Sequence, residues 1–192
     1  MAPDAPSQTK PARVFFALWP DAATARRLHA LATDAQARCG GRAMRRDTLH
    51  LTLAFIGDVS PERLAELLRV GACTGAAAFT LPIDRLGGWR HNRIVWAGAE
   101  VCPAPLVDLV ARLGAGLAAA GFPVERRAFA AHVTLLRNTR AQPAQSPIAP
   151  IDWKVGGFGL FESQLSSEGA HYRPVREWRS GEPAAGGNDG SE

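Results

Sequence analysis

Residues 50–57 read HLTLAFIG, and residues 132–137 read HVTLLR. Each stretch begins with a histidine, carries a threonine two positions later and has aliphatic residues beside both. Side chains in a β-strand alternate between its two faces, so the histidine and the threonine share one face while the aliphatic residues between them point into a core. The two stretches therefore predict two strands that each present one imidazole and one hydroxyl group.

Both stretches belong to a longer internal repeat. A shift of 82 positions (132 − 50) places His50 and Thr52 on the histidine and the threonine of the second stretch. An apolar strand, a helix and a His-x-Thr strand follow one another over residues 14–56, and the same order recurs over residues 94–136. Such a duplication predicts two similar lobes related by a pseudo-two-fold axis, with the four polar groups on opposite walls of a central cleft.

The spacing of apolar residues predicts the remaining elements. Helices are expected to begin at Asp21, Ser60 and Leu106. Strands are expected over residues 14–19, 49–56, 79–86, 93–97, 129–136, 153–162 and 171–178. Loops are expected at Gly87-Gly88 and at residues 141–150, which contain three prolines. This mixture predicts an α+β fold, with antiparallel sheets and helices packed outside them.

Length and composition favour one folded domain. The chain has 192 residues, of which 46% are hydrophobic, and this excludes a wholly disordered protein. We expect one bilobal domain over residues 13–179, with flexible ends at 1–12 and 180–192, which are rich in small residues, proline and charge. The sequence has no apolar run of about 18 residues, and its first 13 residues do not resemble a secretory signal.

Charge and cysteine content give weaker indications of the partners of the protein and of its cellular compartment. The 22 basic and 18 acidic side chains give a net charge of +4, which favours anionic partners without identifying nucleic acid. Cys39, Cys73 and Cys102 are isolated, so neither a disulfide framework nor a structural zinc site is expected. These features favour a cytoplasmic protein, and we expect a monomer without contact with membranes.

The paired histidines are the candidate catalytic groups. Five histidines and nine threonines placed at random would give about 0.2 His-x-Thr triplets, whereas the sequence has two at equivalent points of a repeat. Two imidazoles can serve as base and acid near neutral pH, and two hydroxyls can donate hydrogen bonds to charged oxygens. The set suits in-line displacement at a phosphodiester. Two histidines with no carboxylate at ligand spacing near them make a poor first-row metal site. We expect no cofactor.

The two stretches resemble the signatures of the 2H phosphoesterases. The similarity is closest to the bacterial and archaeal RNA 2′,3′-cyclic phosphodiesterases, also called 2′-5′ RNA ligase-like or LigT-like proteins, and covers residues 13–179. It implies a bilobal fold with both motifs in a central cleft and no metal. It also implies hydrolysis of a terminal RNA 2′,3′-cyclic phosphate to a 2′-phosphomonoester.

The resemblance assigns a role to each residue of the two motifs. His50 would protonate the leaving 3′ oxygen, and His132 would accept a proton from water. Thr52 and Thr134 would hold the phosphate oxygens. The pseudo-symmetry makes the two histidines nearly interchangeable on sequence alone, so the acid and the base are not separated by the residues themselves.

Two further positions match the family, and two depart from it. Phe55 stands where an aromatic ring stacks on the terminal base, and Arg137 where an arginine binds phosphate. Strict alternation would turn both away from their own histidine, so they reach the cleft only if each strand twists, bulges or ends there. Ala43-Met44 replaces the usual Trp-Val before the first motif, and Ala131 replaces a proline before the second.

Other functions use the same residues. The reverse chemistry would join tRNA halves through a 2′-5′ linkage, and a related enzyme would open a small cyclic nucleotide such as ADP-ribose 1″,2″-cyclic phosphate. A non-catalytic module that binds RNA ends is the alternative of another class, although binding alone does not need two titrating imidazoles. His91, between Arg90 and Arg93, is expected in a loop that could contact an RNA backbone.

Overall fold

The computed structural model describes residues 11–75, 77–125, 127–166 and 169–181. Within these residues, nine strands form one sheet of order β7-β4-β5-β6-β3-β1-β8-β9, and β2 pairs with β6 beside this path. The predicted flexible ends lie almost wholly outside the described residues. The elements are β1 (Ala12–Leu18), α1 (Ala22–Cys39), β2 (Arg42–Ala43), the 3-10 helix η1 (Arg46–Thr48), β3 (Leu51–Val59), α2 (Pro61–Thr74), β4 (Phe79–Trp89), β5 (Ile94–Gly98), α3 (Ala104–Ala119), β6 (His132–Arg137), β7 (Ser146–Val155), β8 (Gly157–Ser166) and β9 (Gly169–Arg179).

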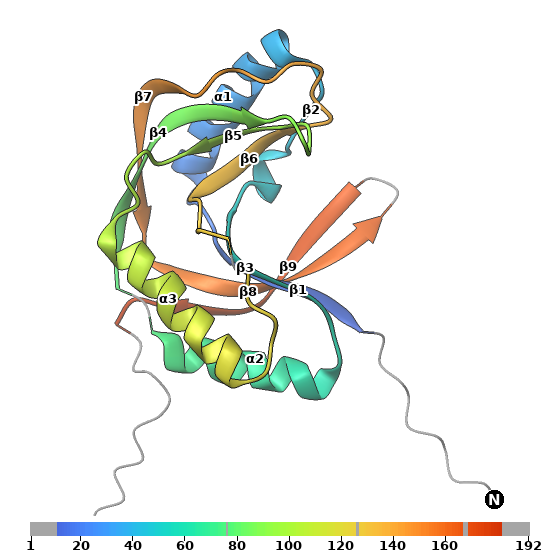
Figure 1. The fold of residues 1–192 in the computed structure, drawn as a ribbon, viewed down its shortest axis with the longest axis vertical. Helices are drawn as coiled ribbons and strands as arrows, with labels where there is room; N and C mark the ends of the chain where they lie inside the picture. The colour runs from blue at the N-terminus through green and yellow to red at the C-terminus, as the bar shows by residue number, and fades with distance from the viewer. Residues whose placement is uncertain (1–10, 76, 126, 167–168, 182–192) are drawn as a thin grey trace, which may run out of the picture.

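The sheet is divided into two lobes that meet at its centre. One lobe holds β7, β4, β5 and β6, with β2 at the side, and the other holds β3, β1, β8 and β9 (Figure 1). Every pairing between neighbouring strands is antiparallel, and the lobes join through a single pair, Leu51 of β3 with Val133 of β6. The predicted α+β fold with two antiparallel lobes is thus confirmed.

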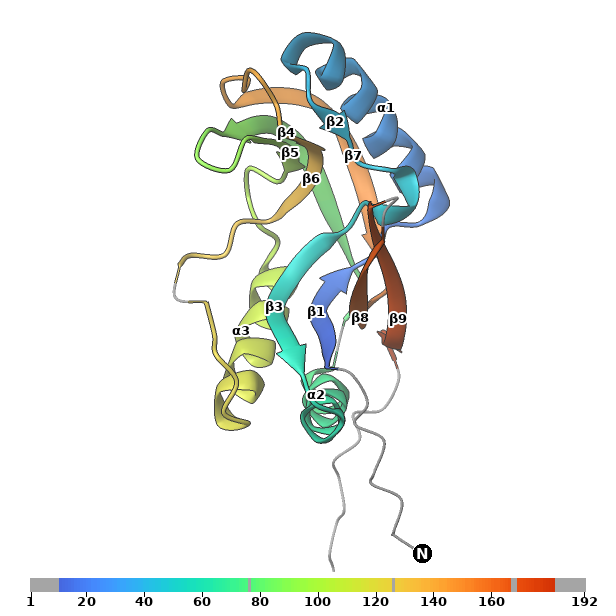
Figure 2. The ribbon, with the colours of Figure 1, turned by 90° about the vertical axis from the view of Figure 1, so that its right-hand side faces the viewer.

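The helices cross between the lobes. α1 follows β1 in the chain but packs against β2, β6 and β7 of the other lobe. α3 follows β5 and packs against β3 and α2, while α2 contacts β8 and β9. Figure 2 shows α1 beside β2 and β7, with α2 and α3 at the opposite end of the molecule. Each repeat therefore gives its helix to the other lobe, which ties the two lobes together.

Local sequence explains where the first two helices begin. The Asp21 carboxylate accepts hydrogen bonds from the backbone N–H groups of Ala23 and Thr24 at 2.7 and 2.9 Å, which caps α1. The Ser60 hydroxyl accepts from the backbone N–H of Arg63, and Pro61 occupies the first turn of α2. α3 begins at Ala104, two residues before the expected Leu106, and this start is the start of α1 shifted by the 82 positions of the repeat.

The expectation of a loop at Gly87-Gly88 was wrong. Both glycines continue β4, which ends at Trp89, and the turn lies at residues 90–93. A Cβ atom on Gly87 would lie 2.5 Å from the Trp96 ring, and one on Gly88 would lie 2.5 Å from Cβ of Gln142. The glycines are needed because neighbouring side chains cover this part of the strand, not because the chain turns.

Three strand boundaries also differ from the prediction. The proline-rich stretch 141–150 was expected to be a loop, but β7 begins at Ser146 and tolerates prolines because it lies at the edge of the sheet. The strand expected over 153–162 is two strands, separated at Gly156. The strand expected from Phe129 begins only at His132.

Most buried side chains form one core that is shared by both lobes, and it includes Phe16, Leu51, Leu113, Val133 and Trp153. A smaller aromatic cluster, formed by Phe15, Ala17 and Phe161 with Trp19 and Tyr172 packed against it, lies apart from this core. In the described part of the chain, no helix has the length and the apolar character needed to cross a membrane.

Candidate active site

The junction between the lobes sets the register of the four motif residues. Leu51 pairs with Val133 in an antiparallel arrangement. Positions on either side of this pair therefore face each other, which sets His50 against Thr134 and Thr52 against His132. Leu51 and Val133 are fully buried, so the four polar side chains lie on the opposite face, toward the cleft.

The two imidazoles are held by the same local contact. Nδ1 of His50 lies 2.8 Å from the carbonyl oxygen of Thr48, and Nδ1 of His132 lies 2.8 Å from that of Ala130, each two residues earlier. A carbonyl oxygen only accepts, so each Nδ1 carries a proton and donates it. In the neutral ring this leaves Nε2 as the unprotonated nitrogen, able to accept a proton and to return it.

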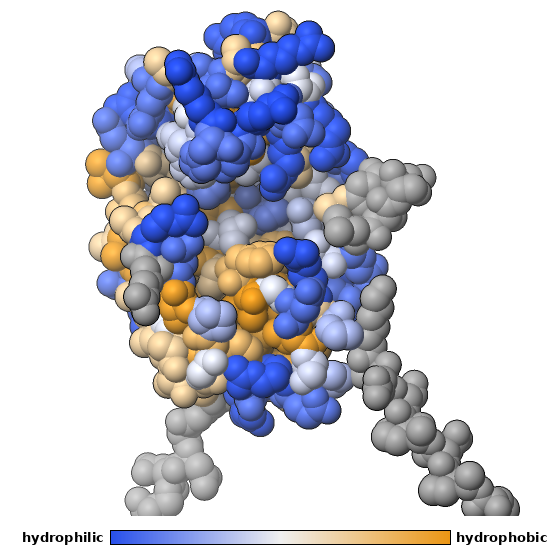
Figure 3. All heavy atoms as spheres, turned by 45° about the vertical axis from the view of Figure 1, so that its right-hand side comes forward, coloured by the Kyte–Doolittle hydropathy of each residue, from blue (hydrophilic) through white to orange (hydrophobic). Residues whose placement is uncertain are grey.

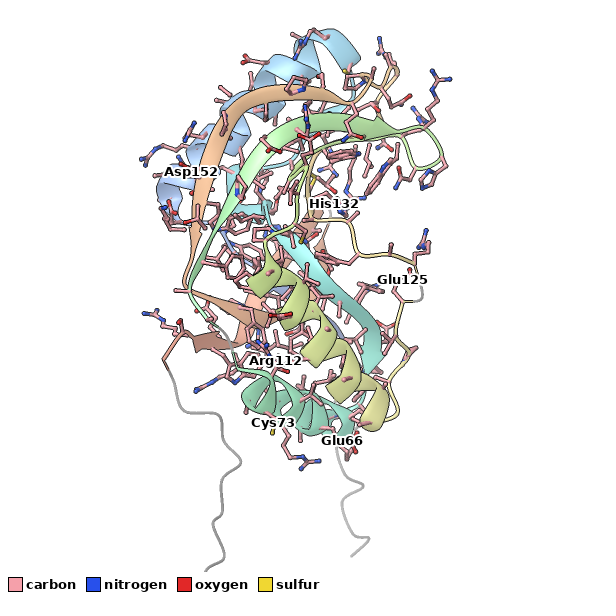
Figure 4. All side chains as sticks on the ribbon, turned by 60° about the vertical axis from the view of Figure 1, so that its left-hand side comes forward. Glu66, Cys73, Arg112, Glu125, His132 and Asp152 are labelled. Carbon is pink, nitrogen blue, oxygen red and sulfur yellow. The ribbon has the colours of Figure 1, made fainter. Side chains whose placement is uncertain are left out.

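The four groups line one pocket of about 200 Å³. The face of the molecule in Figure 3 is hollowed at mid-height, between the two lobes. Figure 4 places His132 where β6 begins, between the strands of one lobe and α3 of the other. The lining consists of Met44, Thr48, His50, Thr52, Trp89, Asn92, Ile94, His132, Thr134 and Arg137. The structure thus brings His50, Thr52, His132, Thr134 and Arg137 together, as the sequence predicts.

His50 is packed among aromatic rings. Its imidazole is stacked on Trp19, with 5.3 Å between ring centroids and 8° between planes, and it meets the Tyr172 ring edge-on at 5.0 Å. Phe15 lies at 4.9 Å. Burial lowers the pKa of His50 to about 4, and the positive charges of Arg137 and His132 act in the same direction, while the hydrogen bond to Thr48 opposes them. The free protein therefore holds His50 neutral at pH 7.

His132 is less buried than His50. The ring of Trp89, from β4, meets it edge-on at 4.6 Å. Burial lowers the pKa of His132 below 6.5, the Arg137 charge adds to this, and the hydrogen bond to the Ala130 carbonyl opposes it. The pKa of His50 is lowered more strongly than the pKa of His132, so His132 is the easier of the two imidazoles to protonate.

Two bulges turn Phe55 and Arg137 toward the cleft face. On β3, Thr52 pairs with Ala17 and Ala54 with Phe16, so Leu53 is an extra residue in the ladder. On β6, Leu135 is extra in the same way, between residues 134 and 136. Each bulge reverses the alternation after the threonine. The sequence requires a twist, a bulge or a strand end before Phe55 and Arg137 can face the cleft, and both repeats meet this requirement with a bulge.

The two side chains nevertheless occupy different surroundings. Arg137 lines the pocket, and its charge contributes to lowering the pKa of both histidines. Phe55 is 56% exposed and lies outside the pocket lining, with the Arg13 guanidinium carbon 5.2 Å from its ring centroid. Its cross-strand partner is Phe15, which contacts His50. Phe55 is therefore placed at the rim of the site, on the side of His50.

Sequence reasoning missed the residues that reach the pocket from distant segments. Trp89 and Asn92 line it from β4 and from the turn that follows β4, and Tyr172 of β9 packs against the His50 ring outside the lining. The pairing of β5 with β6 brings the first two close, and only the fold reveals it. Met44, which departs from the family pattern, lines the pocket.

The described residues contain no group of three or more His, Cys, Asp or Glu side chains placed to hold a metal ion. His29 lies on α1, outside the pocket lining, and His171, on β9, contacts Arg45. The expectation of metal-free chemistry stays a prediction.

Comparison with known proteins identifies the family. The family model described as "LigT like Phosphoesterase" matches the chain over residues 18–96 and again over residues 99–172. Each match contains one His-x-Thr motif, in agreement with the internal repeat. The chain belongs to this family. The LigT-like fold therefore accounts for both the duplicated lobes and the position of the pocket between them.

Two relatives among the LigT-like proteins cover most of the chain. The RNA 2′,3′-cyclic phosphodiesterase of Escherichia coli (strain K12) is 32% identical over 173 residues, which are 88% of this chain and 97% of the relative. The protein of the same name from Methanocaldococcus jannaschii is 26% identical over 149 residues, with coverages of 72% and 84%.

Solved LigT structures have the same fold. The crystal structure of E. coli LigT in apo form superposes with a TM-score of 0.79 at 31% identity, covering 90% of this chain and 99% of that one. The structure of E. coli LigT complexed with 3′-AMP gives a TM-score of 0.78 with the same identity and coverage.

Proposed function

We propose that the protein is an RNA 2′,3′-cyclic phosphodiesterase, which opens the terminal cyclic phosphate to a 2′-phosphomonoester. One observation carries the proposal: two imidazoles, each fixed through Nδ1, share one pocket with two hydroxyls and an arginine. The name of the E. coli relative supports the substrate class.

The reaction needs one proton acceptor and one proton donor. His132 Nε2 takes a proton from water as its oxygen attacks the phosphorus atom. The bond from phosphorus to the 3′ oxygen breaks in line with this attack, and His50 delivers its Nε2 proton to that oxygen. One P–O bond forms and one breaks. Afterwards His132 is protonated and His50 is neutral, so a proton must return to His50 through solvent before the next turnover.

The order of the two pKa values supports this assignment. Because burial lowers the pKa of His50 more strongly, its protonated form is the stronger acid and the better donor to an alkoxide leaving group. His132 keeps the greater affinity for a proton, which suits the base. The negative charge of the bound phosphate raises the pKa of both imidazoles, which supplies the proton that the free protein lacks at pH 7.

The remaining groups bind the anion. The hydroxyls of Thr52 and Thr134 donate hydrogen bonds to the non-bridging oxygens, on which negative charge increases in the transition state. Arg137 adds a fixed positive charge to the same pocket. Phe55 stacks on the terminal base at the rim, with Arg13 holding its ring from the other side.

The test is the turnover of an oligoribonucleotide that ends in a 2′,3′-cyclic phosphate, with the product isomer identified by ³¹P NMR. The proposal predicts the 2′-phosphate as the sole product and the same rate in EDTA. Formation of the 3′-phosphate, or strong inhibition by the chelator, would contradict it. Paired tRNA halves are assayed in parallel, because efficient 2′-5′ joining without hydrolysis would support ligase function instead.

The monomeric state and the cytoplasmic location are part of the same proposal. The two motifs of one chain supply both histidines and both threonines of the pocket, so catalysis does not require a second copy. Cys39, Cys73 and Cys102 are free thiols, as a reducing compartment favours. Sedimentation equilibrium at the assay concentration tests the monomer, and a stable dimer would contradict it.

A further inference from the structure

Three short segments beside the pocket are unusually rich in arginine. Residues 42–47, 90–93 and 137–140 together carry seven arginines and one acidic residue, Asp47. We call the exposed surface that they form the basic rim. In Figure 3 hydrophilic residues dominate the upper half of the molecule, which contains β2, β4 and β5, whereas hydrophobic residues gather below the hollow.

Backbone contacts bring the three segments together at one end of the pocket. Arg42 pairs with Arg137 across β2 and β6, and the backbone N–H of Thr139 donates to the carbonyl oxygen of Arg93 at 3.1 Å. Each segment also adjoins or supplies a lining residue, since Met44, Asn92 and Arg137 face the pocket. The rim is therefore continuous with the site that holds the cyclic phosphate.

Arg42 and Arg137 point toward the same side. Directly opposed residues of an antiparallel pair share a face, and Arg137 lines the pocket, so Arg42 lies on the cleft face beside it. The next pair, Ala43 with Leu136, packs in the core on the other face. Like charges directly opposite each other destabilise a sheet, and an anion bound between them would offset this repulsion.

Two of the seven arginines are engaged within the protein. Arg93 donates to the carbonyl oxygens of Thr139 and Asn138, and Arg45 forms an ion pair with Asp47. The side chains of four others are exposed and, among the residues that the structure describes, take part in no ion pair. These are Arg42, Arg46, Arg90 and Arg140.

An extended polyanion matches this arrangement better than a single phosphate does. The pocket already provides Arg137 and two hydroxyls for one phosphate, whereas the rim spreads further guanidinium groups over three segments outside it. A single RNA strand carries one phosphate per nucleotide, and arginine forks pair well with such oxygens. We propose that the basic rim binds the phosphodiester backbone of the RNA strand that precedes the cyclic phosphate, an inference that rests on the proposed function.

The experiment compares two substrates with the same end. One is a 2′,3′-cyclic mononucleotide, and the other is an oligoribonucleotide about ten nucleotides long that ends in the same cyclic nucleotide. The rim variant is Arg42→Ala/Arg46→Ala/Arg90→Ala. The control variant, Arg26→Ala/Arg69→Ala/Arg179→Ala, removes the same charge at exposed positions on α1, α2 and β9.

The rim variant should lower the ratio of the two kcat/KM values, oligonucleotide over mononucleotide, by at least about tenfold at low salt, mainly through KM. The slope of log kcat/KM against log salt for the oligonucleotide should fall by about 2, since each lost contact with a single strand accounts for about 0.7. The control variant should keep both values. An unchanged ratio, or an equal change in both triple variants, would overturn the proposal.

A binding measurement separates this inference from the proposed function. Fluorescence anisotropy of a labelled oligoribonucleotide that ends in a 2′-phosphate reports affinity without turnover. If the wild-type protein hydrolyses neither substrate, the proposed function fails, but weaker binding by the rim variant than by the control still supports the rim. Equal affinity of the two variants contradicts the rim, whatever the activity.

Discussion

Leu51 of β3 pairs with Val133 of β6, and this pair joins the two lobes of the sheet. It fixes the register of two strands that are related by the internal repeat, and so sets each histidine opposite the threonine of the other motif. A slip of one residue would turn the imidazoles into the core, where the two buried aliphatic side chains now lie. The hydrophobic pair thus determines the geometry of the polar site.

Removal of either imidazole should abolish efficient turnover. His50→Ala and His132→Ala are each expected to reduce kcat by at least about a hundredfold, since each deletes one proton-transfer partner. Steady-state assays with a 2′,3′-cyclic nucleotide measure this. His29→Ala, on α1, serves as the control and should retain activity. Near wild-type turnover by either pocket variant would contradict the two-histidine mechanism.

An activated substrate separates the acid from the base. In an aryl phosphodiester such as bis(4-nitrophenyl) phosphate, the leaving group is a 4-nitrophenolate, which departs without taking up a proton. Removal of the general acid should therefore change the rate little, whereas removal of the general base should still lower it strongly. We expect His50→Ala to approach wild-type activity on this substrate within about tenfold, while His132→Ala stays impaired. The opposite pattern would reverse the assignment.

The threonine hydroxyls should stabilise the transition state more than the fold. Thr52→Val and Thr134→Val keep the side-chain shape and remove one donor each, and we expect kcat to fall by about ten- to a hundredfold. Thr52→Ser and Thr134→Ser, which retain the hydroxyl, should recover most of the loss. Equal defects in the valine and serine variants would mean that the methyl group, rather than the hydroxyl, is required.

Much of this architecture follows from local patterns. The helix caps at Asp21 and Ser60, the buried strand after Arg13 and the repeated His-x-Thr strands are encoded by neighbouring residues, and all form as predicted. The repeat is especially informative because it predicts two strands, one helix and one His-x-Thr motif in each half. A pattern of this kind needs no knowledge of distant contacts.

The wrong secondary-structure predictions occur where contacts with residues far away in the sequence determine the conformation. Gly87 is required because the Trp96 ring of the next strand leaves no room for a side chain there. In the sequence alone, two consecutive glycines indicate a turn, and this led to the wrong prediction. Pro147 is tolerated in β7 because that strand lies at the edge of the sheet, which depends on the whole strand order. Likewise Trp19, directly after β1, and Tyr172, on β9, reach His50 from separate segments, and no spacing in the sequence indicates their contact with it.

The pH dependence of kcat/KM should reflect the lowered histidine pKa values. The active form carries one proton on the pair of imidazoles, and both pKa values lie below 6.5 in the free protein. We expect a bell-shaped profile with its maximum below about pH 6.5, and a tenfold fall per unit above it. Arg137→Gln should move the maximum to higher pH, since its charge lowers both values. A flat profile between about pH 5 and 9 would contradict this account.

Burial of His50 should also make the folded state sensitive to acid. Its pKa is about 4 when folded and 6.5 in the unfolded chain. The unfolded state therefore binds the proton more readily, so stability is complete above 6.5 and is lost as the pH falls from 6.5 toward 4. Between about pH 7.5 and 5 the unfolded imidazole takes up its proton while the folded one stays largely neutral, so the loss is at most about 2 kcal/mol. Urea unfolding of His50→Asn should show a correspondingly smaller loss, and an identical loss would contradict the prediction.

Two helical glycines provide a matched test of packing. A Cβ atom on Gly71 of α2 would lie 2.3 Å from the Trp178 ring, whereas one on Gly114 of α3 would lie 3.7 Å from Val124, an ordinary contact. Gly71→Ala should lower the free energy of unfolding by about 1–3 kcal/mol, and Gly114→Ala should raise it by up to about 1 kcal/mol. Urea denaturation measures both, and a stable Gly71→Ala protein would show that Trp178 is not fixed over α2.

The central claim is that His50 and His132 act on one phosphate group, and ¹⁵N NMR of the histidine rings tests it most directly. Titration with a 2′-phosphomonoester nucleotide, the product, should shift the Nε2 signals of both rings with a single dissociation constant and raise both pKa values together. The Nδ1 signals should change less, because the carbonyls of Thr48 and Ala130 hold them. If only one ring responds, or if the two respond with different dissociation constants, the two imidazoles do not share a phosphate and the mechanism is wrong.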